Sequence, residues 1–301
     1  MDQQILLKIS GLSKKINTSS VLNDIFLTVK EGEIFGLLGP NGSGKTTLIK
    51  CIVGLIRPDS GSIQLNGLHI STSFEKAISS IGAIVENPEF YEYMTGRDHL
   101  KMAAAFYPAA DSDRMKEVIE LVNLGKAIDD RVSTYSLGMK QRLGIAGAVL
   151  HKPKLLILDE PQNGLDPAGM IELRTYIKLL QKNEGTTIIC TSHLLNEMED
   201  LCDRVAILKS GSVIHIHQLK QEGSSRIFIK AEPFNKARKL LSTHFSTIQK
   251  ENGLYIAANA ERIPEITRLL VANSLEVYSI YPVKKSLEEA FLEVTEGRVG
   301  E

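Results

Sequence analysis

Short runs of consecutive apolar residues recur through the first two thirds of the chain. The runs at 34–38, 81–85, 154–158 and 186–190 show little alternation with polar residues, as expected for strands that are buried on both faces of a parallel sheet. Segments that favour helices lie between the runs, the one at 137–150 among them. This alternation of strand and helix predicts an α/β fold with a parallel sheet at its centre.

Two other parts of this region have a different pattern. Residues 1–30 alternate apolar and polar positions, which predicts a small antiparallel sheet. Residues 87–153 favour a mostly helical subdomain, in which Asp111 is placed to cap a helix. The apolar face of that helix has a spacing of three and four and carries Met115, Val118, Ile119 and Val122.

The polar stretch 218–225 is typical of a linker between domains. Beyond it the pattern predicts, in order, a strand at 226–231, a helix at 234–244, strands at 245–250 and 254–258, a helix at 263–273, a strand at 276–281 and a last helix at 286–292. The first six elements follow the split βαβ order of ferredoxin-like folds. We therefore expect two domains, 1–218 and a small α+β accessory domain at 224–301, and we see no catalytic constellation in the second.

Composition narrows the class of protein. Of the 301 residues, 43% are hydrophobic, which is sufficient for a packed core, and the net charge is −1. No basic face is indicated, so we expect no nucleic-acid partner. The apolar runs are shorter than a membrane span needs, and residues 1–4 do not resemble the start of a signal peptide. We expect a cytoplasmic protein whose three cysteines are buried thiols rather than a disulfide or zinc site.

A phosphate-binding loop follows the first buried run. Its pattern is G-x-x-x-x-G-K-[ST], and it lies between a predicted strand and a predicted helix, as this motif requires; a glycine-rich turn with a chance lysine is the alternative. Backbone N–H groups and the helix dipole would bind phosphate, Lys45 would reach the β- and γ-phosphates, and the Thr46 hydroxyl would bind Mg²⁺. The nine positions are Gly39, Pro40, Asn41, Gly42, Ser43, Gly44, Lys45, Thr46 and Thr47.

Two carboxylates end the run at 154–158. Asp159 lies where a parallel strand meets the phosphate site and is placed to bind Mg²⁺ through water, whereas Glu160 can polarise a water molecule for in-line attack. The alternative is an acidic strand end that caps the next turn. Ser136 and Gly138 lie at the start of the helix at 137–150, where they are either a simple cap or a second anion site.

At this point the chain resembles the ATP-binding-cassette (ABC) family of transport ATPases over about residues 5–218. The resemblance rests on the order of five motifs: the loop at 39–47, the signature at 135–139, the strand at 155–160, the D-loop around Asp166 and the switch histidine His193. It implies a P-loop NTPase cassette with a RecA-like core, an antiparallel β subdomain and a helical subdomain. It also implies a homodimer in which each ATP lies between the loop of one copy and the signature of the other.

The resemblance assigns further roles by position. Ser136 and Gly138 would contact the γ-phosphate from the second copy, with Met139 and Asp166 beside the nucleotide, His193 would bind the γ-phosphate within the copy, and Glu160 would activate water. Three aromatic residues and a methionine at 90–94 are candidates for a groove that receives a helix of a membrane subunit, or they only pack the subdomain. The four residues are Phe90, Tyr91, Tyr93 and Met94.

Two departures from the family pattern stand out, and a pair of histidines is a separate candidate. Glu86 occupies the place of a glutamine that ligands Mg²⁺, so we expect a carboxylate near the metal. Ile16 replaces the aromatic residue that stacks on adenine, and apolar contact from Ile16 and Val21 would cover the base instead. His215 and His217 share one face of a predicted strand, but a third metal ligand is not evident.

The Glu86 variant and the form of the signature resemble the bacitracin and lantibiotic resistance branch of exporter ATPases. The sequence therefore predicts the Mg·ATP-hydrolysing subunit of an ABC exporter, peripheral at the inner face of the cell membrane, which drives a separate transmembrane permease that exports a peptide antibiotic, lantibiotic or drug. The alternative is a soluble ABC-type ATPase that acts as a non-transport regulatory or ATP-gated binding module. Cassette proteins that act on ribosomes or DNA are disfavoured, since the chain lacks a second cassette, a long coiled-coil insertion and basic arms.

Overall fold

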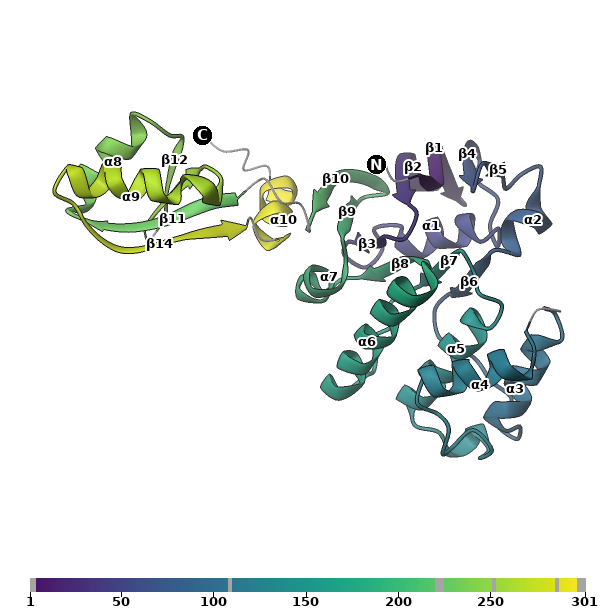
Figure 1. The fold of residues 1–301 in the computed structure, drawn as a ribbon. Coiled ribbons are helices and arrows are strands. Elements are labelled where there is room, and N and C mark those ends of the chain that lie inside the picture. Colours follow the sequence, from purple (N-terminus) through teal and green to yellow (C-terminus); the bar gives the residue numbers. More distant parts are fainter. Residues whose placement is uncertain (1–3, 108–109, 220–224, 251–252, 285–286, 297–301) are drawn as a thin grey trace. The chain divides into compact units, whose positions relative to one another are not determined.

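The computed structural model describes residues 4–107, 110–219, 225–250, 253–284 and 287–296 (Figure 1). The chain divides into two compact units, residues 1–219 and 220–301. The division falls within the stretch 218–225 that the sequence predicts as a linker, of which residues 220–224 lie outside the described residues.

A six-stranded sheet forms the centre of the first unit, in the order β10-β9-β3-β8-β7-β6. All of its neighbouring strands are parallel except β10, which is antiparallel to β9. The predicted apolar runs are confirmed as strands, and those of β3, β7 and β8 are buried at every position. The strands are β3 (Ile34–Leu38), β6 (Ile81–Ile84), β7 (Leu155–Leu158), β8 (Thr187–Ser192), β9 (Arg204–Lys209) and β10 (Ser212–Gln218).

The loops after β3, β7 and β8 lead to three helices: α1 (Lys45–Ile52), α6 (Pro167–Glu184) and α7 (Leu195–Leu201). Because β3, β7 and β8 are parallel, their carboxyl ends meet at one edge of the sheet, where open α/β sheets bind ligands. This edge therefore brings together the three motifs that follow those strands.

A second sheet packs with α1 to complete the core of this unit. Its four strands are antiparallel, in the order β2-β1-β4-β5, which confirms the alternation seen in residues 1–30. Leu12, Leu22 and Leu48 are fully buried in the shared core. The elements are β1 (Ile5–Ile16), β2 (Ser19–Lys30), β4 (Ser60–Leu65), β5 (Leu68–His69) and the short helix α2 (Phe74–Ile78).

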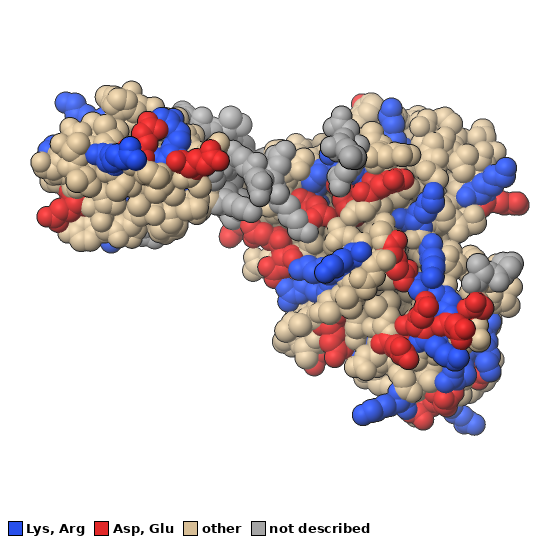
Figure 2. Space-filling view, viewed as in Figure 1, with Lys and Arg blue, Asp and Glu red and all other residues tan. Residues whose placement is uncertain are grey.

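The predicted helical subdomain lies beyond the β6 edge of the six-stranded sheet (Figure 1). It contains α3 (Gly96–Ala104), α4 (Ser112–Leu121), the 3₁₀ turn η1 (Val132–Thr134) and α5 (Leu137–Val149). Asp111 caps α4 as predicted, because its side chain accepts the N–H groups of Asp113 and Arg114. Figure 2 shows Lys and Arg interspersed with Asp and Glu over these helices, so the charge on this face has no single sign.

Arg114 ties α4 to two other helices. Its guanidinium is nearly buried, forms two hydrogen bonds with the Glu184 carboxylate at 2.7 and 2.9 Å, and donates to the carbonyl groups of Val149 and Leu150. We expect Arg114→Met to lower the free energy of unfolding by about 2–4 kcal/mol, because two backbone carbonyl groups and the Glu184 carboxylate lose the buried donor that binds them. Urea denaturation measures the change.

Arg97→Met is the control for that substitution. Arg97 also forms a two-bond pair, with Asp129, but this pair lies at the surface, since the Asp129 side chain is 70% exposed. Loss of a surface pair costs less than about 1 kcal/mol. Equal destabilisation by the two substitutions would show that burial of Arg114 does not decide the effect.

The second unit has its own sheet and core. Its strand order is β12-β13-β11-β14 with all neighbours antiparallel, which is the ferredoxin-like arrangement that the sequence predicts. Ile227, Leu254 and Ile266 are fully buried between the sheet and its helices. The elements are β11 (Ser225–Glu232), α8 (Phe234–Ser242), β12 (Thr247–Lys250), β13 (Gly253–Ala257), the 3₁₀ turn η2 (Ala260–Arg262), α9 (Ile263–Ala272), β14 (Glu276–Lys284) and α10 (Leu287–Glu296).

None of the helices formed by the described residues combines the length and the apolar character that a membrane crossing requires.

Candidate nucleotide site

The loop between β3 and α1 adopts a backbone that requires glycine. Gly42 and Gly44 have φ values of 77° and 107°, in the left-handed region that favours glycine. A Cβ atom on Gly39 would lie 2.5 Å from the carbonyl oxygen of Leu208, and one on Gly44 would lie 3.0 Å from that of Val21. The loop is therefore closely supported by neighbouring backbone, and the predicted residue Val21 lies against it.

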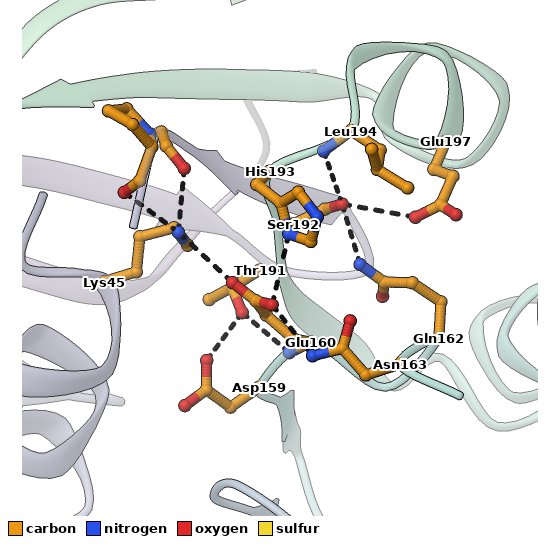
Figure 3. A network of polar contacts seen from close by, with 12 residues as sticks. Lys45, Asp159, Glu160, Gln162, Asn163, Thr191, Ser192, His193, Leu194 and Glu197 are labelled. Atoms are coloured by element: carbon orange, nitrogen blue, oxygen red, sulfur yellow. Dashed lines mark hydrogen bonds and ion pairs between the residues drawn. The ribbon is translucent and has the colours of Figure 1, made fainter. Parts of the chain in front are cut away.

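Lys45 is held at the inner side of this loop. Its side chain is 5% exposed, and its ammonium group donates to the carbonyl groups of Gly39 at 2.8 Å and Pro40 at 3.4 Å. The same group lies 3.3 Å from Oε1 of Glu160, with which it forms an ion pair (Figure 3). The structure thus joins the lysine of the loop to the second carboxylate that the sequence singles out.

Both the backbone and the side chain of Glu160 are held by hydrogen bonds. Its backbone has φ 47° and its N–H donates to Thr191 Oγ1 at 2.8 Å. Its Oε2 accepts the Nδ2–H of Asn163 at 2.9 Å and lies 3.2 Å from Nδ1 of His193 (Figure 3). An ionised carboxylate only accepts hydrogen bonds, so Nδ1 of His193 is the donor in this contact.

The protonation state of Glu160 follows from these contacts. Burial raises its pKa, but hydrogen bonds from Asn163 and Lys45 and the positive charge of Lys45 outweigh burial and leave the pKa below its ordinary value. Glu160 is therefore a carboxylate at neutral pH. It can accept a proton.

Asp159 and Thr46 supply oxygen atoms near this carboxylate. Asp159 is 3% exposed, and its Oδ1 accepts the hydroxyl of Thr191 at 2.6 Å. Thr46 lies in the first turn of α1. A carboxylate and a hydroxyl oxygen fit the preference of Mg²⁺ for hard oxygen ligands. Among the described residues, no group of three or more His, Cys, Asp and Glu is placed to hold a metal ion, so substrate or water would have to complete the coordination.

Glu86 has a different partner from the one that the sequence suggests. The loop that carries it lies beside Asp159, because the Asp159 N–H donates to the carbonyl of Ile84. Its carboxylate, however, pairs with Nζ of Lys50 at 2.7 Å and is 63% exposed. Lys50 follows Thr46 by one helical turn on α1. The structure therefore pairs the Glu86 carboxylate with Lys50, and its role as a metal ligand stays a prediction.

Four predicted residues lie at a second site, at the starts of α5 and α6: Ser136, Gly138, Met139 and Asp166. Ser136 caps α5 by accepting the N–H of Met139 at 3.3 Å, and Asp166 caps α6 by accepting the N–H of Gly169 at 2.9 Å. Both helix starts face one cavity of about 470 Å³, which is lined in part by Ser136, Gly138 and Asp166 and by none of the residues of the phosphate loop. Neither Lys45 nor Glu160 lines this cavity.

The remaining predictions concern residues outside these two places. Ile16 ends β1 with its side chain 43% exposed. The rings of His215 and His217 lie on one face with centroids 6.1 Å apart. Phe90 packs edge-on against His99, which favours a packing role for this ring.

Two tyrosines of the same segment instead favour the predicted docking surface. Tyr91 stacks on His99 yet is 55% exposed, and Tyr93 is 71% exposed. The segment therefore combines one packed ring with two that are open to solvent.

Four residues near Glu160 have no role assigned from the sequence: Gln162, Asn163, Thr191 and Ser192. All four make side-chain hydrogen bonds in the network of Figure 3. Their position at the carboxyl ends of β7 and β8, where ligands of parallel sheets bind, is the signal that could have found them.

Comparison with known proteins agrees with this geometry. A family model for ABC transporters matches residues 22–163. The chain is 49% identical over 293 residues to the uncharacterized ABC transporter ATP-binding protein YdbJ of Bacillus subtilis, which covers 96% of this chain and 95% of the relative. It is 36% identical to the bacitracin transport ATP-binding protein BcrA of Bacillus licheniformis, over 97% of this chain and 98% of that protein.

A solved structure of an ATP-binding subunit of an ABC transporter is similar with a TM-score of 0.65 and 32% sequence identity, over 71% of this chain and 90% of that one. The ordered motifs, the cassette fold and relatives that match over nearly the full length agree. The chain therefore belongs to the ABC transporter family, as one of its ATP-binding proteins.

Proposed function

We propose that the protein hydrolyses Mg·ATP as a homodimer and thereby drives a separate transmembrane permease that exports a peptide antibiotic, a lantibiotic or a related drug. The observation that carries the proposal is the Glu160 carboxylate, which is ionised at neutral pH and held between Lys45 and His193 at the carboxyl edge of the sheet. An ATP-gated module without hydrolysis has no use for a base in this position.

Binding of the phosphates rests on the loop at 39–47. Its backbone N–H groups and the start of α1 present positive partial charge, and Lys45 adds a full one. Thr46 and Asp159 would hold Mg²⁺, which when bound neutralises charge on the phosphates. Ile16 and Val21 would cover the base through apolar contact, since no aromatic ring stands at position 16.

Proton transfer rests on Glu160. In the structure, Lys45 and His193 stabilise its charge. Phosphate oxygens at the loop would compete for the ammonium group of Lys45 and for the N–H donor of His193. Because loss of a neighbouring positive charge raises a carboxylate pKa, Glu160 becomes a stronger base when the site fills. This exchange would activate the attacking water only when substrate is present, with His193 free to donate to the γ-phosphate.

The second copy supplies the rest of the site in this proposal. Ser136 and Gly138 lie at the exposed start of α5, apart from Lys45, so they are available to a nucleotide on another chain. A Cβ on Gly138 would meet atoms of its own chain only at 3.5 Å or beyond. Glycine at 138 therefore leaves room for a close approach from outside the chain. Met139 follows Gly138 in the first turn of α5, and Asp166 caps α6 and lines the same cavity.

The export of an antibiotic is supported by one relative, the bacitracin transport ATP-binding protein BcrA, which matches 97% of this chain. We place the protein in the cytoplasm, at the inner face of the membrane beside its permease, with the exposed Tyr91 and Tyr93 as the surface that contacts it. Phosphate release by the purified protein tests hydrolysis, and bacitracin susceptibility of a deletion strain tests the cargo. A folded protein without ATP-dependent phosphate release would contradict the proposal.

Glu86 gives a prediction specific to this chain. If Glu86 leaves Lys50 and ligands Mg²⁺ when ATP binds, Glu86→Gln should weaken the apparent Mg²⁺ affinity in the ATPase reaction by about tenfold, because an amide binds a dication less strongly than a carboxylate does. ATPase rate against free Mg²⁺ measures it, with and without the permease. Superimposable curves would show that Glu86 serves only its exposed pair with Lys50, which is worth less than about 1 kcal/mol.

A further inference from the structure

A second chain of hydrogen bonds lies behind Glu160 and joins the loops that follow β7 and β8 (Figure 3). Gln162 is buried and donates from Nε2 to Ser192 Oγ at 2.7 Å. The Ser192 hydroxyl donates to Oε2 of Glu197 at 3.2 Å and accepts the N–H of Leu194 at 2.9 Å. His193 stands between Ser192 and Leu194, so these bonds fix the backbone on both sides of the histidine.

These contacts satisfy the whole hydrogen-bonding capacity of the Ser192 hydroxyl. A hydroxyl has one proton to donate and two lone pairs to accept with. Glu197 takes the proton, while Gln162 and Leu194 fill the lone pairs. Ser192 is completely buried, so water does not replace Gln162 without a change in the local structure.

Gln162 also lies in the loop between β7 and α6, which carries both Glu160 and Asp166. Glu160 precedes it by two residues and Asp166 follows it by four. The carbonyl of Pro161, next to Gln162, accepts a hydrogen bond of 3.0 Å from Gln141 of α5, the helix that begins at the signature. The loop is thus held from one side by α5 and from the other by the strand end that carries His193.

We propose that Gln162 is a positioning residue for ATP hydrolysis: through Ser192 it fixes His193 relative to Glu160, and it couples this pair to the loop that presents Asp166. Gln162 acts through these side chains and has no contact with the nucleotide in the proposal. The inference rests on the proposed ATPase activity. It predicts that loss of the amide slows turnover without weakening ATP binding, which depends on the phosphate loop.

Gln162→Met and Gln162→Glu test the proposal, with Gln181→Met as the matched control. Methionine keeps the length of the side chain and removes its donor. Gln181 makes bonds of the same kind at the far end of α6, where its Nε2 donates to the carbonyl of Gly32 at 2.8 Å and to Asp203 at 3.1 Å. The readouts are kcat and KM for ATP, the Kd of a fluorescent ATP analogue, and thermal unfolding.

The glutamate variant adds a readout that packing alone would not move. A protonated carboxyl at position 162 donates to Ser192 Oγ as the amide does, whereas an ionised carboxylate has no proton to donate. The ionised form is also repelled by the Glu197 carboxylate. Burial and the charges of Glu197 and Glu160 raise the pKa of the new carboxyl, against the opposing charges of Arg174 and His193. Activity relative to the parent protein should therefore rise at least about fivefold between about pH 8 and about pH 6.

We expect Gln162→Met to lower kcat at least about tenfold, with KM and Kd within about twofold of the parent, and Gln181→Met to stay within about twofold throughout. Equal kcat for the two methionine variants overturns the inference. If Gln162→Met does not fold, the Gln162→Glu profile decides, since a ratio to the parent that does not change with pH overturns it too. An inactive parent protein would instead count against the proposed function.

Discussion

Replacing Glu160 by glutamine is expected to reduce kcat for ATP hydrolysis by about 10²–10⁴-fold while ATP binding persists. An amide is close in shape to the carboxylate, and its oxygen still accepts the hydrogen bond that Asn163 donates at 2.9 Å. The variant therefore keeps the geometry of the loop and loses the proton acceptor. Steady-state phosphate release and the Kd of a fluorescent ATP analogue measure the two effects separately.

The control for this substitution is Glu75→Gln, which changes an exposed carboxylate of α2 outside the site. It should leave kcat within about twofold of the parent protein. Full turnover by Glu160→Gln would mean that another group accepts the proton and that the contacts of Lys45 and His193 with Glu160 are structural only.

Replacing Lys45 by alanine is expected to weaken ATP binding by at least about 100-fold, because the phosphates lose the cationic side chain of the loop. The structure adds a second cause. Lys45 holds the carbonyl groups of Gly39 and Pro40 at 2.8 and 3.4 Å, so its loss also loosens the loop backbone. Isothermal titration with ATP and Mg²⁺ measures the change in affinity.

Lys116→Ala is the matched control, since Lys116 pairs with Asp113 on the exposed side of α4. Its ATP affinity should equal that of the parent within about twofold. If Lys45→Ala binds ATP as tightly as Lys116→Ala does, the phosphates are not bound where the motif indicates.

The positions of Lys45, Asp159, Glu160 and His193 follow from the sequence because each ends or follows a buried strand. Parallel strands bring their carboxyl ends to one edge, so the spacing of apolar runs locates the site before any coordinates are known. The cap of α4 and the order of elements in the second unit also follow from sequence patterns, a capping aspartate and a split βαβ succession of strands and helices.

The partners of individual side chains could not be predicted in the same way. The pairs of Glu86 with Lys50 and of Lys45 with Glu160 join residues far apart in the chain, and their side chains meet only because of how the loops fold. The predicted strand at 81–85 ends at Ile84, since residue 86 adopts a left-handed backbone with φ 63°. Gln162 carries no motif signal, and only its contact with Ser192 reveals it.

We propose that hydrolysis takes place between two copies, with Lys45 and Glu160 of one copy and Ser136 and Gly138 of the other. Sedimentation velocity of Glu160→Gln with ATP and Mg²⁺ tests it most directly, because this variant binds ATP without consuming it. We predict that the 33.2 kDa chain sediments as a monomer without nucleotide and as a dimer with ATP, and that adding Gly138→Asp abolishes the dimer. A Glu160→Gln protein that binds ATP and remains a monomer, or a dimer that Gly138→Asp does not disturb, would contradict the account.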